Sequence, residues 1–216
     1  GHSYDYTPDK FMISTSSGIN GNFIYVYNDG QPLLQKFANV KIETIYKTPD
    51  INTQFNLLGF KVTDSNGTIF YFGISKDKKR MAISYDRVEK SENYLNGSLT
   101  IEEEGIDFYP SAWQLMEIHT PEGGKVEYIY PNKPEESTFY RKGPDKVVTN
   151  GVRSSFSKMK SIQYHVKEIR FSSGSLHFIP SKIEREDLVG GFNLKNILLT
   201  NNVGKVIKRF DLSHAY

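Results

Sequence analysis

Hydrophobic and polar residues alternate along most of this chain, and the alternating runs come in pairs joined by glycine-bearing turns. The clearest pair is Gly59–Gly73, where two such runs flank Asp64-Ser65-Asn66-Gly67. Alternation with a period of two is the pattern of a half-buried β-strand, and a Gly-bearing turn between two strands favours an antiparallel hairpin. The sequence therefore predicts a β-hairpin at this position.

Other segments repeat the pattern. Looser or longer hairpins are predicted at Trp113–Tyr130, Val166–Phe178 and Leu194–Phe210, and single strands at Lys10–Ser14, Asn22–Tyr27 and Lys41–Tyr46. No segment keeps a 3.6-residue apolar period over three turns, so little helix is expected. We therefore predict an all-β fold, an antiparallel hairpin-built curved sheet or a two-layer β-sandwich.

Two polar stretches interrupt this pattern. Asp86–Gly97 is expected to be a polar, mobile segment, and the apolar content also falls between Pro131 and Lys160. We expect residues 1–216 to form a single β domain, with a lobe boundary or a long loop within 131–160. The segment Ile207–Tyr216 still alternates where the sequence ends, so we expect this chain to be a fragment of a longer one.

Charge and composition exclude several classes of protein. The 27 Lys and Arg residues nearly balance 25 Asp and Glu residues, and the two signs are interspersed, whereas a nucleic-acid binder would carry a basic stripe. No run of about 18 apolar residues exists, so no membrane-spanning helix is predicted. The absence of Cys excludes disulfides, thiolate metal sites and a cysteine nucleophile.

Carboxylates are the first candidates for chemistry. They cluster at Glu102, Glu103, Glu104 and Asp107, and they recur at Glu117 and Glu127 in the Trp113–Tyr130 hairpin. A glycoside hydrolase needs two carboxyl groups roughly 5–10 Å apart across a sugar site. Because adjacent strand residues point to opposite faces, closeness in sequence does not produce such a pair. We therefore predict no catalytic residues.

Metal sites find little support in the sequence. The segment Asp64-Ser65-Asn66-Gly67 begins like a calcium loop, but Thr68-Ile69-Phe70 follows where further acidic ligands would stand, so we interpret it as a hairpin turn. The histidines are His2, His119, His165, His177 and His214, and no two have the i, i+4 spacing of helical metal ligands. No metal and no cofactor is predicted.

Strand aromatics remain the candidates for ligand binding. Exposed rings on a β face can stack on sugars, whereas buried rings form the core or cross-strand pairs. The candidate ligand-binding residues are Trp113, Tyr71, Tyr128 and Tyr130. As the alternative, Trp113 anchors the core, with Phe60, Phe70, Phe72, Leu115, Ile118, Tyr128 and Phe171 as its neighbours.

The repeated pattern resembles a known family. It is carried by Pro8-Asp9-Lys10-Phe11 with Gly21-Asn22-Phe23, by Gly59–Gly73, by Ser111–Tyr130, and by Val166–Phe178 with Ile183–Asp187 and Leu194. These parts cover most of the chain and resemble the N-terminal β region of exported YD-repeat (RHS-type) proteins of Bacteroidetes. The resemblance implies a modular protein exported to the cell surface or the extracellular space, with a signal segment ahead of this chain and no active site in this portion.

The sequence thus leads to one expected function and two alternatives. We expect a non-catalytic structural or binding module whose partner is the rest of its own longer chain. A glycan, or a protein docked on an open sheet edge, is a further expected partner; nucleic acid is not. The first alternative is a carbohydrate-binding module that uses exposed strand aromatics, and the second is a glycoside hydrolase.

Overall fold

A computed structural model describes residues 10–15, 18–25, 32–34, 39–47, 57–95, 98–102, 108–143, 145–148 and 151–214. These residues form strands and turns but no helix, and their strand pairings are antiparallel. The all-β, hairpin-built prediction is therefore confirmed. The described residues include no apolar helix of the length that crossing a bilayer requires.

The chain divides into two compact units. Unit 1 comprises Gly1–Ala82 and Trp113–Tyr128, and unit 2 comprises Ile83–Ala112 and Ile129–Tyr216. The chain passes between the units three times, and none of these crossings lies within 131–160, where a lobe boundary was considered. That the whole chain acts as a single domain stays a prediction.

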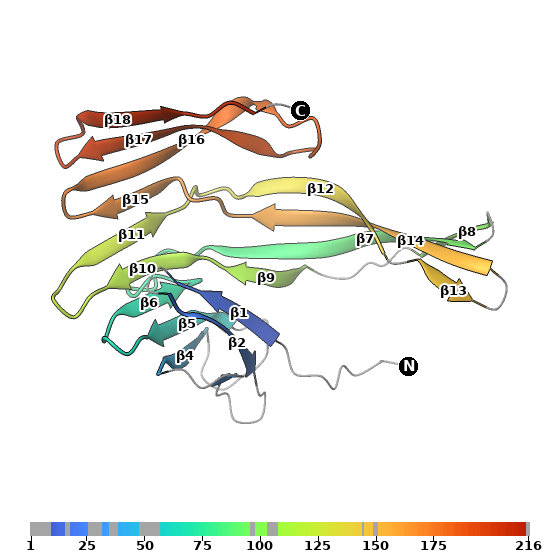
Figure 1. Ribbon diagram of the computed structural model, residues 1–216, viewed down its shortest axis with the longest axis horizontal. Helices are drawn as coiled ribbons and strands as arrows, with labels where there is room; N and C mark the ends of the chain where they lie inside the picture. Colours follow the sequence, from blue (N-terminus) through green and yellow to red (C-terminus); the bar gives the residue numbers. More distant parts are fainter. Residues whose placement is uncertain are drawn as a thin grey trace. The chain divides into compact units, whose positions relative to one another are not determined.

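Unit 1 contains two sheets (Figure 1). The first has the order β1-β2-β3, with β1 at Lys10–Ser14, β2 at Asn20–Tyr25 and β3 at Pro32–Leu34. The second has the order β11-β10-β6-β5-β4. Its strands are β4 (Lys41–Tyr46), β5 (Leu57–Thr63), β6 (Ile69–Phe72), β10 (Leu115–His119) and β11 (Lys125–Ile129).

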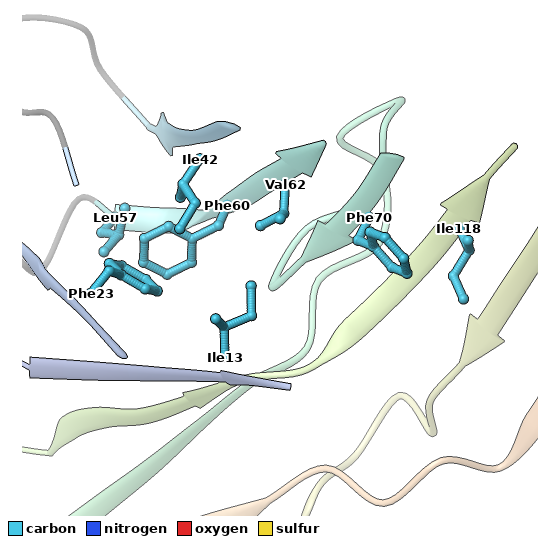
Figure 2. Packing of buried hydrophobic residues seen from close by; sticks show 8 residues of the cluster. All are labelled: Ile13, Phe23, Ile42, Leu57, Phe60, Val62, Phe70 and Ile118. Carbon is cyan, nitrogen blue, oxygen red and sulfur yellow. The ribbon is translucent and has the colours of Figure 1, made fainter. Parts of the chain in front are cut away.

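The core of unit 1 lies between these two sheets. Figure 2 shows Ile13 and Phe23 of the first sheet lying near Leu57 and Phe60 of the second, and the Phe23 and Phe60 ring centroids are 5.4 Å apart. Burying each large apolar side chain contributes roughly 1.5–3 kcal/mol. The remaining buried members of the cluster are Ile42, Val62, Phe70 and Ile118. Unit 1 is thus a two-layer β-sandwich.

Unit 2 contains an extended sheet and a hairpin meander (Figure 1). The extended sheet has the order β12-β14-β7-β8, with β13 on β14 and β9 on β7. Its strands are β7 (Ile83–Leu95), β8 (Ser98–Glu102), β9 (Tyr109–Trp113), β12 (Glu135–Lys142), β13 (Lys146–Val148) and β14 (Gly151–Gln163). The meander runs in chain order through β15 (Glu168–Phe171), β16 (Gly174–Glu184), β17 (Phe192–Asn201) and β18 (Val206–Asp211).

Both stretches that we expected to be loops are strands. β7 occupies most of Asp86–Gly97, and β12, β13 and β14 occupy most of 131–160, so these two predictions are wrong. Their polar side chains are paired with one another across the strands: Glu89 Oε2 lies 2.9 Å from Lys158 Nζ, and the Ser161 hydroxyl donates to Asp86. Cross-strand pairs of this kind stabilise strands that are rich in polar residues.

The turns predicted from glycine are confirmed. Gly67 and Gly123 have φ of +82° and +87°, a region that residues with a Cβ rarely adopt. Asp64 Oδ1 accepts hydrogen bonds from the N–H groups of Asn66 and Thr68, at 2.8 and 2.9 Å. Asp64 therefore stabilises the turn, as the hairpin interpretation requires. In the predicted strand Asn22–Tyr27, Val26 and Tyr27 lie outside the described residues.

Candidate functional site

Trp113 packs on the core side of unit 1. Its ring centroid lies 5.4 Å from those of both Phe11 and Phe60, and its indole Nε1–H donates to the Leu57 carbonyl oxygen at 3.2 Å. The half-buried indole therefore has both an apolar environment and a partner for its one polar group. Phe60, Phe70 and Ile118 are buried in the same core cluster, against which Trp113 itself packs.

The other three candidate aromatics lie elsewhere. Tyr128 packs against the core cluster with Val126, two residues before it on the same face of β11, and burial raises the pKa of Tyr128. Tyr71 is buried too, but it alternates with Phe70 and so lies on the opposite face of the sheet. Tyr130 belongs to unit 2, where its ring contacts Tyr164 with centroids 6.2 Å apart.

The four candidates therefore do not form a common row. Trp113 and Tyr128 lie on the core side of unit 1, Tyr71 lies on the other side of that sheet, and Tyr130 belongs to unit 2. Phe171, named as a neighbour of Trp113, also lies in unit 2, on β15.

A cluster of ionisable side chains lies on the same face as Tyr71, on the side of the unit 1 sheet away from the core. We call it the charged cluster, and its members are Arg80, Glu117, His119, Lys125 and Glu127. Glu117 and His119 are two residues apart on β10, so they share a face, and β11 places Glu127 directly opposite Glu117 and Lys125 directly opposite His119. Two carboxylates directly opposite each other repel, so this hairpin needs a cation between them.

Arg80 supplies that cation. Its Nη2 lies 2.8 Å from both Glu117 Oε1 and Glu127 Oε1, and its Nη1 donates to the Tyr128 carbonyl oxygen at 3.4 Å. Lys125 Nζ lies 3.0 Å from Glu127 Oε1 and 3.8 Å from Glu117 Oε2. The guanidinium thus bridges β10 and β11 through both carboxylates.

A tight turn holds Arg80 in place. Ser75 N–H donates to the Arg80 carbonyl oxygen at 2.9 Å, and Arg80 N–H donates to Ser75 Oγ at 3.0 Å. The Ser75 hydroxyl in turn donates to Asp77 Oδ1 at 2.6 Å, and this hydrogen bond, with a second from Lys79 N–H, lowers the pKa of Asp77. The charged segment Lys76–Arg80 is therefore part of a hydrogen-bonded turn that fixes the position of Arg80.

His119 forms a hydrogen bond with the second carboxylate oxygen of Glu117. Its Nε2 lies 2.7 Å from Glu117 Oε2, and since a carboxylate only accepts hydrogen bonds, Nε2 is the donor. The imidazole also meets the Tyr71 ring edge to face, with centroids 5.5 Å apart. Glu117 is only 2% exposed, so its negative charge is neutralised by neighbours rather than by water.

This geometry suits a structural ion-pair network better than acid–base catalysis. A glycosidase pair needs open carboxyl groups with a sugar or water between them. Here a guanidinium bridges Glu117 and Glu127, and both oxygens of Glu117 have protein partners. The described residues contain no group of three or more side chains that could hold a metal.

Sequence reasoning considered Glu117 and Glu127 but missed Arg80. The hairpin register could have identified it, because two glutamates opposite each other on a buried face require a nearby cation. Of the other carboxylate cluster, Glu103, Glu104 and Asp107 lie outside the described residues.

Unit 2 contains an open hollow of about 370 Å³ near the β15–β16 and β17–β18 turns. Within it His177 Nε2 lies 3.2 Å from Thr200 Oγ1, whose hydroxyl also contacts the Ser175 carbonyl oxygen. The lining residues are Phe171, Gly174, Ser175, His177, Thr200, Asn201, Asn202 and Gly204. They offer hydrogen bonds, and the carboxylate opposite His177, that of Glu168 on β15, is paired with Arg170.

Comparison of the chain with protein-family models, with curated proteins and with solved structures gave no match.

Proposed function

We propose that this chain is a non-catalytic structural and binding module of an exported cell-surface protein of the YD-repeat type. In this proposal the rest of the longer chain extends the unit 2 meander by adding a strand beside β18. The observation that carries the proposal is that all six residues of β18 are exposed, at the end of a meander in which β15, β16, β17 and β18 pair in chain order. Among the described strands, β17 is the one neighbour of β18.

The hydrogen-bonding groups of the edge can be located from the register. Leu212 N–H donates to the Lys195 carbonyl oxygen of β17 at 2.9 Å, so Leu212 faces β17. In an antiparallel pair this orientation alternates, which turns Phe210 and Lys208 toward β17 and turns Asp211 and Arg209 outward. The backbone N–H and C=O of Arg209 therefore point to the open edge, where an added strand would bind.

The side chains of β18 suit the addition of a strand. Val206, Ile207 and Phe210 are exposed apolar residues, and no proline blocks pairing along this edge. Lys208 Nζ lies 4.8 Å from the Phe210 ring centroid, and Arg209 follows it. An added strand with apolar and acidic side chains would complement these groups.

The two alternatives receive less support. Trp113, Tyr71, Tyr128 and Tyr130 do not share one exposed face, so a sugar platform made of these four residues has no common surface. A glycoside hydrolase centred on Glu117 and Glu127 would have to displace Arg80.

The test is a proline substitution at the outward position. Arg209→Pro removes an outward N–H and leaves the β17 ladder intact, and edge strands tolerate proline. We expect it to change the unfolding free energy of the chain alone by less than about 1 kcal/mol. In the full natural gene product it should lower the melting temperature of this module clearly, because the added strand loses a hydrogen bond.

Two control variants sharpen the test. Arg209→Gln keeps the outward N–H and removes only the side-chain charge, which is paired with Asp211, so it should lower the melting temperature of the full product less than Arg209→Pro does. Lys208→Pro removes an inward N–H and should cost more than about 1 kcal/mol in both contexts. Equal effects of Arg209→Pro in the chain alone and in the full product would contradict strand addition at β18.

A further inference from the structure

Three aromatic side chains form a diagonal across the extended sheet of unit 2, and none of them was a sequence-based candidate. We call Tyr140, Phe156 and Tyr94 the aromatic diagonal; they lie on β12, β14 and β7, which are neighbours in the sheet (Figure 1). The register pairs Lys142 with Phe156. Tyr140 is thus one strand over and two residues away from Phe156.

The next step of the diagonal has the same geometry. Phe156 pairs with Glu92 on β7, and Tyr94 lies two residues further along that strand. Directly opposed residues share a sheet face, and so do residues two apart on a strand, so the three rings project from one face. The Phe156 and Tyr94 rings are in edge-to-face contact with centroids 5.7 Å apart, and Tyr140 is 70% exposed.

Polar groups stand between and beside these rings. In the row through Phe156, Lys142 flanks the ring on β12 and Glu92 flanks it on β7. Lys142 Nζ lies 3.0 Å from Asp145 Oδ2, and the Ser154 hydroxyl donates to Asp145 Oδ1 at 2.7 Å. These two hydrogen bonds lower the pKa of Asp145, so the carboxylate is charged at neutral pH. A lysine ammonium has three N–H donors, of which this ion pair takes one.

The lysine side chains that the structure describes on this face are paired with carboxylates. Lys142 is paired with Asp145, Lys158 is paired with Glu89 at 2.9 Å, and Glu92 accepts a hydrogen bond from the Tyr94 hydroxyl at 3.0 Å. A surface for a polyanion such as single-stranded nucleic acid would combine stacking rings with unpaired cations. The aromatic diagonal instead combines stacking rings with paired charges, which suits an uncharged polymer.

The polar groups around the central ring favour a ligand other than a protein, although Leu99 and Ile101, each 47% exposed, lie on the same face opposite Tyr94 and Glu92. The core of a protein interface is depleted of charged residues. Here charged side chains stand on both sides of the central ring, and Lys142 Nζ lies 6.0 Å from the Phe156 ring centroid. Sugar rings match this arrangement, because their C–H faces stack on aromatic rings while their hydroxyls bond to carboxylate, hydroxyl and ammonium groups.

We propose that the aromatic diagonal of Tyr140, Phe156 and Tyr94 is a binding platform for an uncharged polysaccharide chain. The proposal rests on the proposed function, since it names a ligand class for the same non-catalytic module. It uses a surface other than the β18 edge, so the two can fail separately.

The test is titration of the whole chain with soluble uncharged polysaccharides, namely laminarin, xyloglucan and galactomannan, by affinity electrophoresis and calorimetry. We expect saturable binding to at least one of them that persists when the salt concentration rises from 50 to 500 mM, roughly the range over which phosphate-type binding collapses. Tyr140→Ala should weaken binding by at least about tenfold, because it removes one of the three stacking rings. Its high exposure makes Tyr140 safe to truncate without unfolding the chain.

Controls separate this site from the sheet edge. Phe210→Ala truncates an exposed ring on β18 and should leave polysaccharide binding unchanged, as should Arg209→Pro. Phe156→Ala, checked for folding by circular dichroism, should weaken binding as much as Tyr140→Ala. The proposal is overturned by a flat panel, by binding that Tyr140→Ala leaves unchanged, or by binding to single-stranded DNA alone. It is also overturned by self-association of the chain that Tyr140→Ala abolishes, which would assign this face to a protein contact.

Discussion

Gly59 of β5 lies against the backbone of β6 so closely that no side chain fits. A Cβ at this position would lie 1.9 Å from the Phe72 carbonyl oxygen, and one at Gly73 would lie 2.5 Å from Trp113 Cδ1. Only backbone displacement could relieve the first contact. These glycines therefore allow β5, β6 and Trp113 to approach one another.

Gly59→Ala should accordingly destabilise the chain by about 1–3 kcal/mol, the usual cost of overpacking a core. The matched control is Gly21→Ala on β2, where an added Cβ meets nothing within 4 Å. Urea unfolding followed by circular dichroism measures both variants. Equal stability of the two would contradict the close approach at Gly59.

Trp113→Ala should cost about 3 kcal/mol, because it removes a large ring from the core and leaves the Leu57 carbonyl without its donor. Circular dichroism must report unfolding here, since Trp113 is the one tryptophan of the sequence. A change of less than about 0.5 kcal/mol, the range of ordinary surface substitutions, would show that the ring is dispensable for folding.

Glu168 of β15 provides a prediction about pH. A bidentate pair with Arg170, at 2.8 and 2.9 Å, lowers the pKa of Glu168 below its usual value of 4.5. Since the folded-state pKa is the lower one, the pair stabilises the chain above the unfolded pKa, and that stability is lost as the pH falls through the folded pKa. Arg170 is largely exposed, so the contribution is at most about 1 kcal/mol.

Glu168→Gln should therefore destabilise the chain at pH 7 and make little difference at pH 2.5. Glu186→Gln, at an exposed carboxylate in the same unit, serves as the control and should be neutral at both values. Urea midpoints at the two pH values measure this. An equal loss at both would assign the role of Glu168 to packing.

At the scale of elements, the charged cluster ties the turn before Arg80 to the β10–β11 hairpin. Arg80→Met should cost about 3 kcal/mol, because Glu117 then stays buried and faces Glu127 without the bridging guanidinium. Arg80 is about one-third exposed, which places the expected cost at the lower end of the range for buried pairs. Lys79→Met, in the exposed part of the same turn, is the matched control.

Removing the partner charge as well distinguishes ion pairing from packing. If the guanidinium acts by charge, Arg80→Met combined with Glu117→Gln should be less destabilising than the sum of the single changes. Additive losses would mean that Arg80 and Glu117 act independently.

The sequence indicated some elements well and others poorly for identifiable reasons. The hairpins around Gly67 and Gly123 were predictable because both the alternation and the turn residues pointed to them. β7 and β14 were not, since residues such as Glu89 and Lys158 resemble a loop until their partners across the strands are known.

The same limit applies to the candidate site. The sequence identified aromatic residues within strands, but which face of the sheet each ring occupies depends on the strand register. The register of β10 is irregular between Leu115 and Glu117, and the alternation of apolar and polar residues cannot predict such an irregularity. Arg80 was overlooked because its partners are 37 and 47 residues away. Tyr140, Phe156 and Tyr94 were overlooked because β12, β14 and β7 had not been recognised as neighbours.

At the scale of the whole molecule, the two units differ in what they offer. Unit 1 has a closed two-layer core and a charged cluster whose groups bind one another. Unit 2 has an exposed end strand and, on β12, the exposed ring of Tyr140. The proposed binding functions therefore belong to unit 2, and unit 1 is proposed to be structural.

The central claim, strand addition at β18, is tested most directly by hydrogen–deuterium exchange of the Val206–Asp211 amides. The chain alone is compared with the full natural gene product. We predict that the outward amides of Arg209 and Asp211 exchange rapidly in the chain alone and at least about tenfold more slowly in the full product, since an added strand would bond them. Equal exchange of these two amides in both samples would contradict the proposed function.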